Sequence, residues 1–425
     1  MSKLMLSFSA FVATVLALGS ARAASAQQVV KLGEGETLTI SGFVSATMFT
    51  NSGLFSSFGQ GQNAAIAACP VVQAGCTVAQ PTTDKTFTDG DFRNTRLNFT
   101  FNGSPVLGKW APRATVEFDF FGAFNGAPPF GDEQPQIRGR LIFADLSNGR
   151  TTVRIGQFWS PSFAEVPVSL THIAFPTGYG ASGEIGWRFP GVFLYQDLSA
   201  AGAPLNVQLQ LAVMKGSGPA ATLRDSSAAT NIGNGEASGM PQVEARLNFA
   251  KRSANLGWSA YVVGHVDWKD TTGTGRDTTN LGAKDSNLSA WGIEGGGSIN
   301  PGKLTLHGNV YYGKALGQLF AHITQTSPAE GDIRGWGAWA QAGYDFTPHW
   351  SLWGYYGLDQ PDQQRLTKDH PGAVLARQQS HEGDALLRFR AGRYALGLEY
   401  YRSAVRWSTG PAHAGQVALS VLYTL

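Results

Sequence analysis

Arginine residues recur at alternate positions of several short segments in the first half of the chain. Six of them share one polar parity: Arg96, Arg113, Arg138, Arg140, Arg154 and Arg188. A guanidinium stays charged at any physiological pH and binds carboxylate or phosphate through two parallel hydrogen bonds. Two carboxylates, Glu117 and Asp119, fall on the same parity and could neutralise part of the charge. The pattern indicates either a surface that attracts anions or an ion-pair network that stiffens it, and the excess of arginine favours attraction.

These arginines lie in segments whose apolar and polar residues alternate. In residues 96–101 and 113–120, the apolar parity is rich in phenylalanine, and the other parity carries charged and polar residues. A period of two is typical of a β-strand with two different faces. A half-solvated soluble sheet tolerates such faces. A transmembrane barrel requires them, because lipid contacts one face and a watery lumen contacts the other.

Two further alternating segments, residues 136–141 and 151–156, flank a tight turn with Asn148 and Gly149 at its tip. Asn-Gly between two alternating segments is a strong short-range signal of a β-hairpin. The arginines of this hairpin would therefore face the same side as those of the preceding strands and form one wall with them.

A proline-rich segment without periodicity, residues 160–183, follows the hairpin. Its apolar content suits a loop that packs against something. Inside a barrel, we expect this loop to narrow the passage with Glu165, His172 and Tyr179, and to bring Glu165 near the arginines. The alternative is a surface loop over the barrel mouth or against a neighbouring subunit.

The composition restricts the class of protein. The chain has 425 residues, of which 15% are charged, and its formal net charge is +2. This balance argues against nucleic-acid binding, which needs a clustered excess of basic residues. Mean hydropathy is −0.12, and beyond the N-terminus no apolar run reaches the length of a membrane helix. A helical membrane protein is disfavoured, whereas a barrel remains compatible because alternation averages its hydropathy toward zero.

Residues 1–26 have the pattern of a signal peptide. Lys3 precedes a long apolar stretch, and a small-x-small cleavage site ends at Ala26. We therefore expect export and a mature chain that begins near Gln27, with residues 27–425 as one domain. A buried N-terminal helix is the alternative.

The chain contains two cysteines, Cys69 and Cys76, in a loop rich in glycine, alanine and proline. In an oxidising compartment this spacing closes a small disulfide ring. Free thiols are the alternative. A metal site is disfavoured because no histidine or aspartate ligand lies nearby in the sequence.

The mature chain contains about 16 alternating segments whose connections are in turn long and short. Bacterial outer-membrane barrels have this layout, with an even number of strands. Before the last segment we expect one more loop, residues 403–413. Tryptophan and tyrosine at the ends of the segments suit interfacial girdles, and a soluble core would suit them equally. The fold class is therefore predicted as an all-β transmembrane antiparallel β-barrel with an inward-folded third loop.

Signals for catalysis are weak. No Gly-x-Ser-x-Gly elbow, P-loop or His-Glu-x-x-His motif occurs. Residues 335–340 match the permissive dinucleotide pattern, but they lie inside an alternating segment and open no helix. The histidines are too dispersed in the sequence to support a metal site or a catalytic triad. We predict no enzyme activity, no metal and no cofactor.

Four short motifs follow one another between residues 92 and 161. They are Arg93-Asn94-Thr95-Arg96-Leu97, Glu117-Phe118-Asp119-Phe120-Phe121-Gly122, the arginine segment 138–141, and Gly156-Gln157-Phe158-Trp159-Ser160. In order and spacing this stretch resembles the DcaP-like porins of Gram-negative outer membranes. The resemblance implies a 16-stranded trimeric channel with a constricting third loop and a basic lumen suited to dicarboxylates.

Together, these features predict a passive diffusion channel for small hydrophilic solutes in the Gram-negative outer membrane. We expect a preference for small anions such as dicarboxylates, contact with outer-membrane lipid, and assembly as a homotrimer. Two other classes remain open. One is a barrel enzyme of the lipase or protease type, and the other is a structural or adhesive barrel with a plugged lumen.

Overall fold

The computed structural model describes most of the chain after the predicted signal peptide. The described residues are 28–56, 59–71, 79–81, 86–122, 124–125, 134–200, 202–216, 234–251, 256–269, 288–319, 333–364 and 377–425. Residues 1–26 and Cys76 therefore lie outside the described part.

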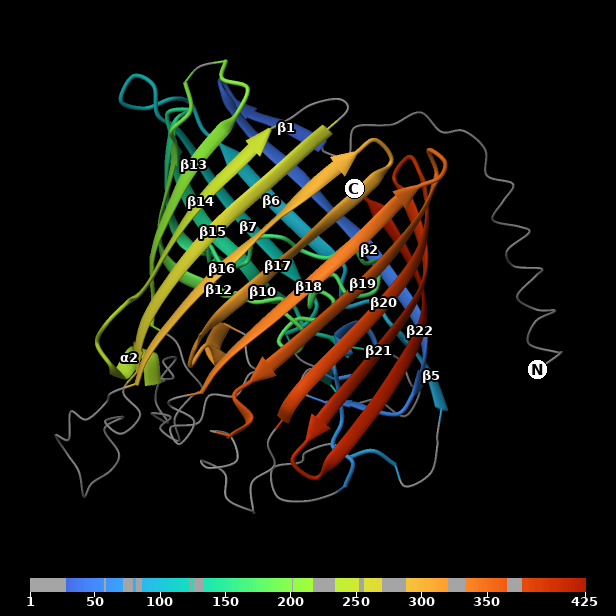
Figure 1. Ribbon diagram of the computed structural model, residues 1–425. Coiled ribbons are helices and arrows are strands. Elements are labelled where there is room, and N and C mark those ends of the chain that lie inside the picture. The colour runs from blue at the N-terminus through green and yellow to red at the C-terminus, as the bar shows by residue number, and fades with distance from the viewer. Residues whose placement is uncertain are drawn as a thin grey trace.

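Sixteen strands form one closed antiparallel β-barrel (Figure 1). They are β2 (Glu36–Ser52), β6 (Arg96–Asn102), β7 (Ala111–Asp119), β10 (Arg138–Ser147), β11 (Thr151–Trp159), β12 (Arg188–Asp197), β13 (Asn206–Met214), β14 (Gln242–Lys251), β15 (Leu256–Lys269), β16 (Leu288–Pro301), β17 (Leu304–Lys314), β18 (Arg334–Asp345), β19 (Trp350–Pro361), β20 (Arg377–Ala391), β21 (Tyr394–Trp407) and β22 (Gly410–Thr424). Each strand pairs with the next along the chain, and β2 pairs with β22 from Phe43↔Thr424 to Ser52↔Gly415. This last pairing closes the sheet and confirms the predicted fold class.

Shorter elements accompany the barrel. They are β1 (Gln28–Gly33), β3 (Phe55–Ser56), β4 (Ile66–Ala67), β5 (Thr86–Asp91), β8 (Phe124–Asn125), β9 (Gln134–Pro135), the 3-10 helices η1 (Gly61–Asn63) and η2 (Gly317–Leu319), and the short helix α2 (Asn234–Ala237). Strand β5 pairs with β2 beyond β6 and prolongs that strand, and β1 pairs with the first residues of β2. Among the described residues, no helix is both long and apolar enough to span a membrane.

The two faces of the barrel wall have opposite polarity. On β21, the outward Leu398 and Tyr400 are 39% and 46% exposed, whereas the inward Glu399 and Tyr401 are each 1% exposed. Other strands repeat this outward apolar parity, with exposed Ile142, Ile155, Val192, Val213, Ile293, Val310, Leu352 and Val417. The apolar outer face suits contact with lipid, and the polar inner face suits a lumen, so this barrel is of the membrane-spanning type.

The two ends of the barrel differ in their connections. One end carries short turns and the chain's C-terminal residues, and the other end carries the longer loops (Figure 1). We call them the short-turn end and the long-loop end. The predicted turn at Asn148 and Gly149 belongs to the short-turn end, where Gly149 adopts a φ of 91° that favours glycine.

The connection between β21 and β22 is shorter than the sequence suggested. We expected a loop over residues 403–413, but β21 continues to Trp407 and β22 begins at Gly410. Alternation persists here because the inward side chains Val405, Trp407 and Ala412 pack against another segment inside the barrel.

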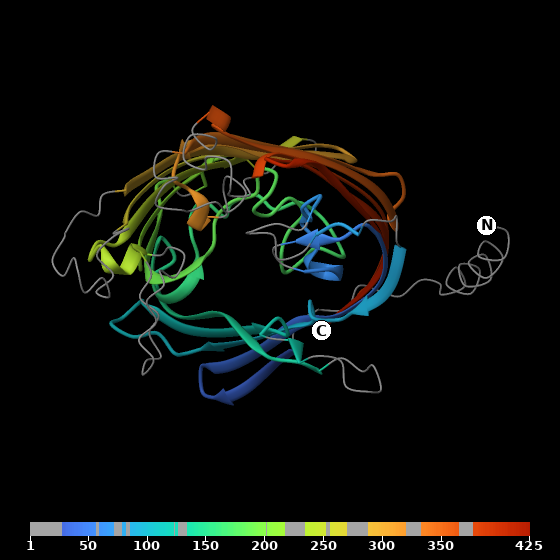
Figure 2. The same cartoon turned by 90° about the horizontal axis from the view of Figure 1, so that it is seen from below.

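That segment belongs to the first long loop, whose described residues 53–56 and 59–69 fold into the barrel (Figure 2). Phe55 and Ile66 are fully buried there beside Tyr401 and Trp407. The Tyr401 hydroxyl donates to the carbonyl of Ala65 over 2.6 Å. The alanine-rich stretch of this loop packs onto the inner faces of β21 and β22.

Candidate pore wall and constriction loop

The six predicted arginines come from the neighbouring strands β6, β7, β10, β11 and β12, and their guanidinium groups lie on the inner side. Asp119 on β7 has no exposed surface and binds two of them. Its Oδ2 accepts from Arg138 Nη2 at 2.6 Å and from Arg140 Nη1 at 2.7 Å. Arg140 Nε also donates to Glu117 Oε1 at 2.8 Å. Both carboxylates are thus paired with arginines on the inner side of the barrel.

A third carboxylate, Asp145 on β10, belongs to this wall and was missed in the sequence. Its Oδ1 accepts from Arg154 Nε at 2.7 Å, and its Oδ2 accepts from Arg113 Nε at 3.1 Å. The pairing of β10 with β7 shifts register between Gly139 and Leu141. This irregularity changes the parity of the strand, so Asp145 faces inward although strict alternation from Arg138 would turn it outward.

Arg96 and Arg188 differ from the other four arginines because neither has a close carboxylate partner. The nearest carboxylate contact of Arg96 is Nε to Glu117 Oε1 at 3.9 Å, which is beyond hydrogen-bonding distance. Two buried nitrogens of each guanidinium, Nε and Nη2 of Arg96 and Nε and Nη1 of Arg188, have no hydrogen-bond partner among the described residues. The wall therefore holds six arginines against three carboxylates, and Arg96 and Arg188 account for two of the three excess positive charges.

Aromatic rings cover the faces of several guanidinium groups. Arg188 lies 4.9 Å from the ring centroid of Trp159 and 4.4 Å from that of Trp187. Arg154 lies 3.8 Å from the ring centroids of both Phe143 and Phe158. Because a guanidinium stacks on aromatic faces and donates from its edges, these contacts fix the groups without using their N–H donors.

The third loop, residues 160–187, runs along the opposite inner wall. Its backbone is held by inward carboxylates of the barrel wall. Ser162 N donates to Glu244 Oε2 on β14 at 2.8 Å. Glu399 on β21 accepts from the backbone N–H groups of Leu170 at 3.2 Å and Thr171 at 3.0 Å, and from the Ser169 hydroxyl at 2.6 Å. These acids therefore bind the loop and do not stand free in the lumen.

The prediction that the third loop folds inward agrees with these contacts, but the expected position of Glu165 was wrong. Glu165 Oε1 accepts from Ser259 Oγ on β15 at 3.3 Å, and its Oε2 lies 3.4 Å from His307 Nδ1 on β17. The carboxylate thus meets the wall opposite the arginines, because the first part of the loop follows that wall. The loop reaches the arginines instead with Phe175, whose ring centroid is 5.2 Å from Arg138.

His172 and Tyr179 are both buried within the third loop. The His172 ring lies 4.8 Å from the Tyr401 ring, and burial lowers the pKa of His172, although nearby Glu399 acts in the other direction. The Tyr179 hydroxyl donates to the carbonyl of Gly186, and burial raises the pKa of Tyr179. Both residues therefore serve to hold the loop in place, and neither presents a polar group to a solute.

A segment after β17 also packs inside the barrel. Leu316 and Leu319 are each 1% exposed and lie against Ile185 of the third loop and Phe193 of β12. Gly186 N donates to the carbonyl of Leu319 at 2.7 Å. Together with the first loop, these contacts make the interior of the long-loop half of the barrel partly apolar.

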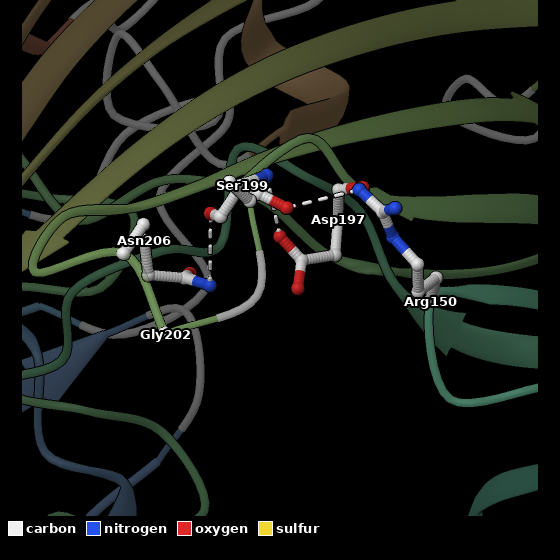
Figure 3. Close-up of a pocket in the computed structure, with 7 residues that line it drawn as sticks. Arg150, Asp197, Ser199, Gly202 and Asn206 are labelled. Atoms are coloured by element: carbon white, nitrogen blue, oxygen red, sulfur yellow. Dashed lines mark hydrogen bonds between the residues drawn. The ribbon is translucent and has the colours of Figure 1, made fainter.

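A polar pocket of about 340 Å³ lies at the short-turn end (Figure 3). It is lined by Arg150, Asp197, Ser199, Ala200, Gly202, Ala203 and Asn206. The Arg150 guanidinium donates to the carbonyl of Ser199 at 2.9 Å. This arginine therefore ties two turns together and is separate from the arginine wall.

In the described part of the chain, no group of three or more His, Cys, Asp or Glu side chains is arranged to hold a metal ion. Cys69 is buried and disulfide-bonded. Its predicted partner, Cys76, lies outside the described residues.

Comparisons with known proteins show similarity to solved structures only. No family model and no curated protein matches the chain. Among solved structures, the outer membrane channel DcaP of Acinetobacter baumannii matches with a TM-score of 0.66 and 17% identity, over 93% of this chain and 99% of that one. In vitro folded OmpT, an outer membrane protein of Vibrio cholerae, matches with a TM-score of 0.53 and 10% identity, over 94% of this chain and 100% of that one.

Pseudomonas putida OprB matches with a TM-score of 0.52 and 11% identity, over 91% of this chain and 94% of that one. At these identities the likeness concerns the fold. The resemblance to the DcaP-like porins is thus confirmed in the fold, and the chain is a closed barrel of the Gram-negative outer-membrane type.

Proposed function

We propose that the protein is a passive diffusion channel for small hydrophilic solutes, with a preference for small anions such as dicarboxylates. The observation that carries this proposal is the arginine wall, in which Arg96 and Arg188 keep buried N–H donors without an acceptor. A buried charge without a partner is costly, so an anion that reaches this wall gains more there than a cation does.

Three acids of the opposite wall already accept hydrogen bonds from the protein and therefore offset this preference only in part. Glu244 and Glu399 accept hydrogen bonds from the backbone of the third loop, and Glu382 accepts from the hydroxyls of Ser182 and Ser403. These carboxylates are covered by the loop that they hold. A narrow passage with low-dielectric walls magnifies the remaining positive field of the arginines.

We also propose that the barrel assembles as a homotrimer. One solved structure of Vibrio cholerae OmpT with a similar fold is described as a trimer form. The apolar outer wall offers a surface that either lipid or a second copy can cover. Chemical cross-linking in mild detergent tests this assignment, and a purely monomeric product would contradict it.

A second candidate function is a structural barrel whose lumen is plugged. The observation in its favour is the packing of the first loop, the third loop and residues 315–319 inside the barrel. Single-channel recording of the purified protein in a planar bilayer separates the two functions. Regular conductance steps support the channel, whereas a tight bilayer with correctly folded protein supports the plug.

A further inference from the structure

The outer surface of the barrel carries an unusual group of cationic side chains near the long-loop end. On β21, Arg402 and Arg406 both occupy the outward parity and are exposed. Neither residue forms an ion pair with a described residue, in contrast to most arginines of the inner wall. A charge on the lipid-facing side needs either water or an oppositely charged group of the membrane.

The position of the two arginines relates them to the edge of the membrane. About 9–11 tilted residues of a transmembrane strand cross the hydrocarbon layer. Counted from Tyr394, the first outward residue of β21, this span ends near Ser403. Arg402 and Arg406 thus lie on either side of the expected outer boundary, directly after the outward apolar Leu398 and Tyr400. They are at the depth where lipid headgroups begin.

The register of the neighbouring strands gives this surface a defined shape. Ala404 lies between the two arginines, and it pairs with His381 on β20 and with His413 on β22. Outward side chains of directly paired residues lie about 5 Å apart. Two arginines and two histidines therefore frame one small residue on three adjacent strands.

Glycines open the surface further. Arg402 pairs with Gly383 on β20 and with Gly415 on β22, so neither of its directly paired residues has a side chain that could cover it. The His381 ring is oriented by a hydrogen bond of 2.7 Å between its Nδ1 and the hydroxyl of Tyr356. The outward positions of β20, β21 and β22 contain no aspartate or glutamate. The framed surface thus carries two arginines and no carboxylate.

We propose that this surface, made of Arg402, Arg406, His381 and His413 around Ala404, binds the phosphate of a lipid headgroup in the leaflet at the long-loop end. Its partner is a phosphorylated glycolipid of the outer leaflet. Arginine binds phosphate through parallel hydrogen bonds, and the acyl chains of the lipid would lie along the apolar outer wall below. The two-residue turn between β21 and β22 leaves this part of the rim uncovered by its own connecting loop.

Native mass spectrometry of the purified barrel with added lipid A tests the proposal. The variant Arg402→Gln/Arg406→Gln removes both guanidinium groups, and Lys109→Gln/Lys251→Gln makes the same charge change at exposed sites of the short-turn end. We expect lipid A to bind wild type and the control alike, and to bind the arginine variant roughly ten- to thirtyfold more weakly. Dephosphorylated lipid A should show no difference between the proteins.

A second variant distinguishes a loss of lipid binding from misfolding of the arginine variant. Ala404→Glu places a carboxylate between the two arginines and should also weaken lipid A binding, while heat-modifiable migration on a gel reports that the barrel is intact. Equal binding of lipid A to wild type and both variants would overturn the proposal. Binding of inorganic phosphate as tightly as lipid A would also overturn it. The same holds if the arginine variant loses its oligomers while its binding of lipid A is unchanged.

Discussion

Arg140 and Arg188 lie over the same indole ring, that of Trp159, at 5.8 Å and 4.9 Å from its centroid. Arg140 is neutralised by Glu117 and Asp119, whereas Arg188 has no ion pair among the described residues. Two guanidinium groups on one ring repel each other unless anions balance both. This relationship divides the arginine wall into groups whose charge is paired with a carboxylate and groups whose positive charge no described carboxylate balances.

Asp119→Asn should destabilise the barrel strongly. The substitution removes the carboxylate that Arg138 and Arg140 share, and both guanidinium groups then lack part of their compensation. Loss of one partner of a buried ion pair costs about 3–5 kcal/mol. Unfolding in detergent, followed by heat-modifiable migration, measures the change. Arg113→Gln is the control, because Asp145 keeps Arg154 as its partner; equal stability of both variants would contradict the assignment.

Glu399→Gln should loosen the third loop. The carboxylate accepts three hydrogen bonds from residues 169–171, and an amide oxygen replaces it less well. A hydrogen bond to a charged group contributes about 1.5–3 kcal/mol, so the population of displaced loop should rise at least tenfold. Single-channel records should show larger and noisier currents. Glu36→Gln, at an exposed position of β2, should leave the current unchanged.

Acid should loosen the same loop through His172. Burial lowers the pKa of His172 below its usual 6.5, so the folded loop binds fewer protons there than the released loop does. Stability of the closed loop is therefore complete above pH 6.5 and falls as the pH drops below this value. Conductance recorded from neutral to mildly acidic pH should rise in wild type. His172→Gln should flatten this rise, and an identical pH profile would refute the role of the histidine.

The disulfide of Cys69 should close on Cys76, the one other cysteine in the sequence. Intact-mass measurement should find no alkylated thiol before reduction and two afterwards. Because Cys69 is buried with the first loop inside the barrel, Cys69→Ser should also enlarge the conductance. If this loop lay on the outside of the barrel, Cys69→Ser would leave the conductance unchanged. Alkylation of both thiols without reduction would exclude the bond.

The barrel and its arginine wall could be read from the sequence because a period of two assigns each residue to lipid or lumen. Asp145 was not assigned to the arginine wall from the sequence, because one register shift between Gly139 and Leu141 reverses the parity of β10. Glu165 was misplaced because its position depends on the path of the whole third loop, which contacts with Glu244 and Glu399 determine. Such contacts join residues far apart in the chain, and local alternation contains no information about them.

The zero-current potential under a potassium chloride gradient tests the anion preference most directly. Wild type, Arg188→Gln and the matched control Arg113→Gln should be recorded at low ionic strength and again at molar salt, where the screening length is about 3 Å. We expect an anion-selective potential in wild type, a clear reduction in Arg188→Gln, and a smaller change in Arg113→Gln, because the Arg113 side chain is 43% exposed to screening solvent and shares Asp145 with Arg154. All three potentials should converge at molar salt. Cation selectivity of wild type, or an unchanged potential in Arg188→Gln at low salt, would contradict the account.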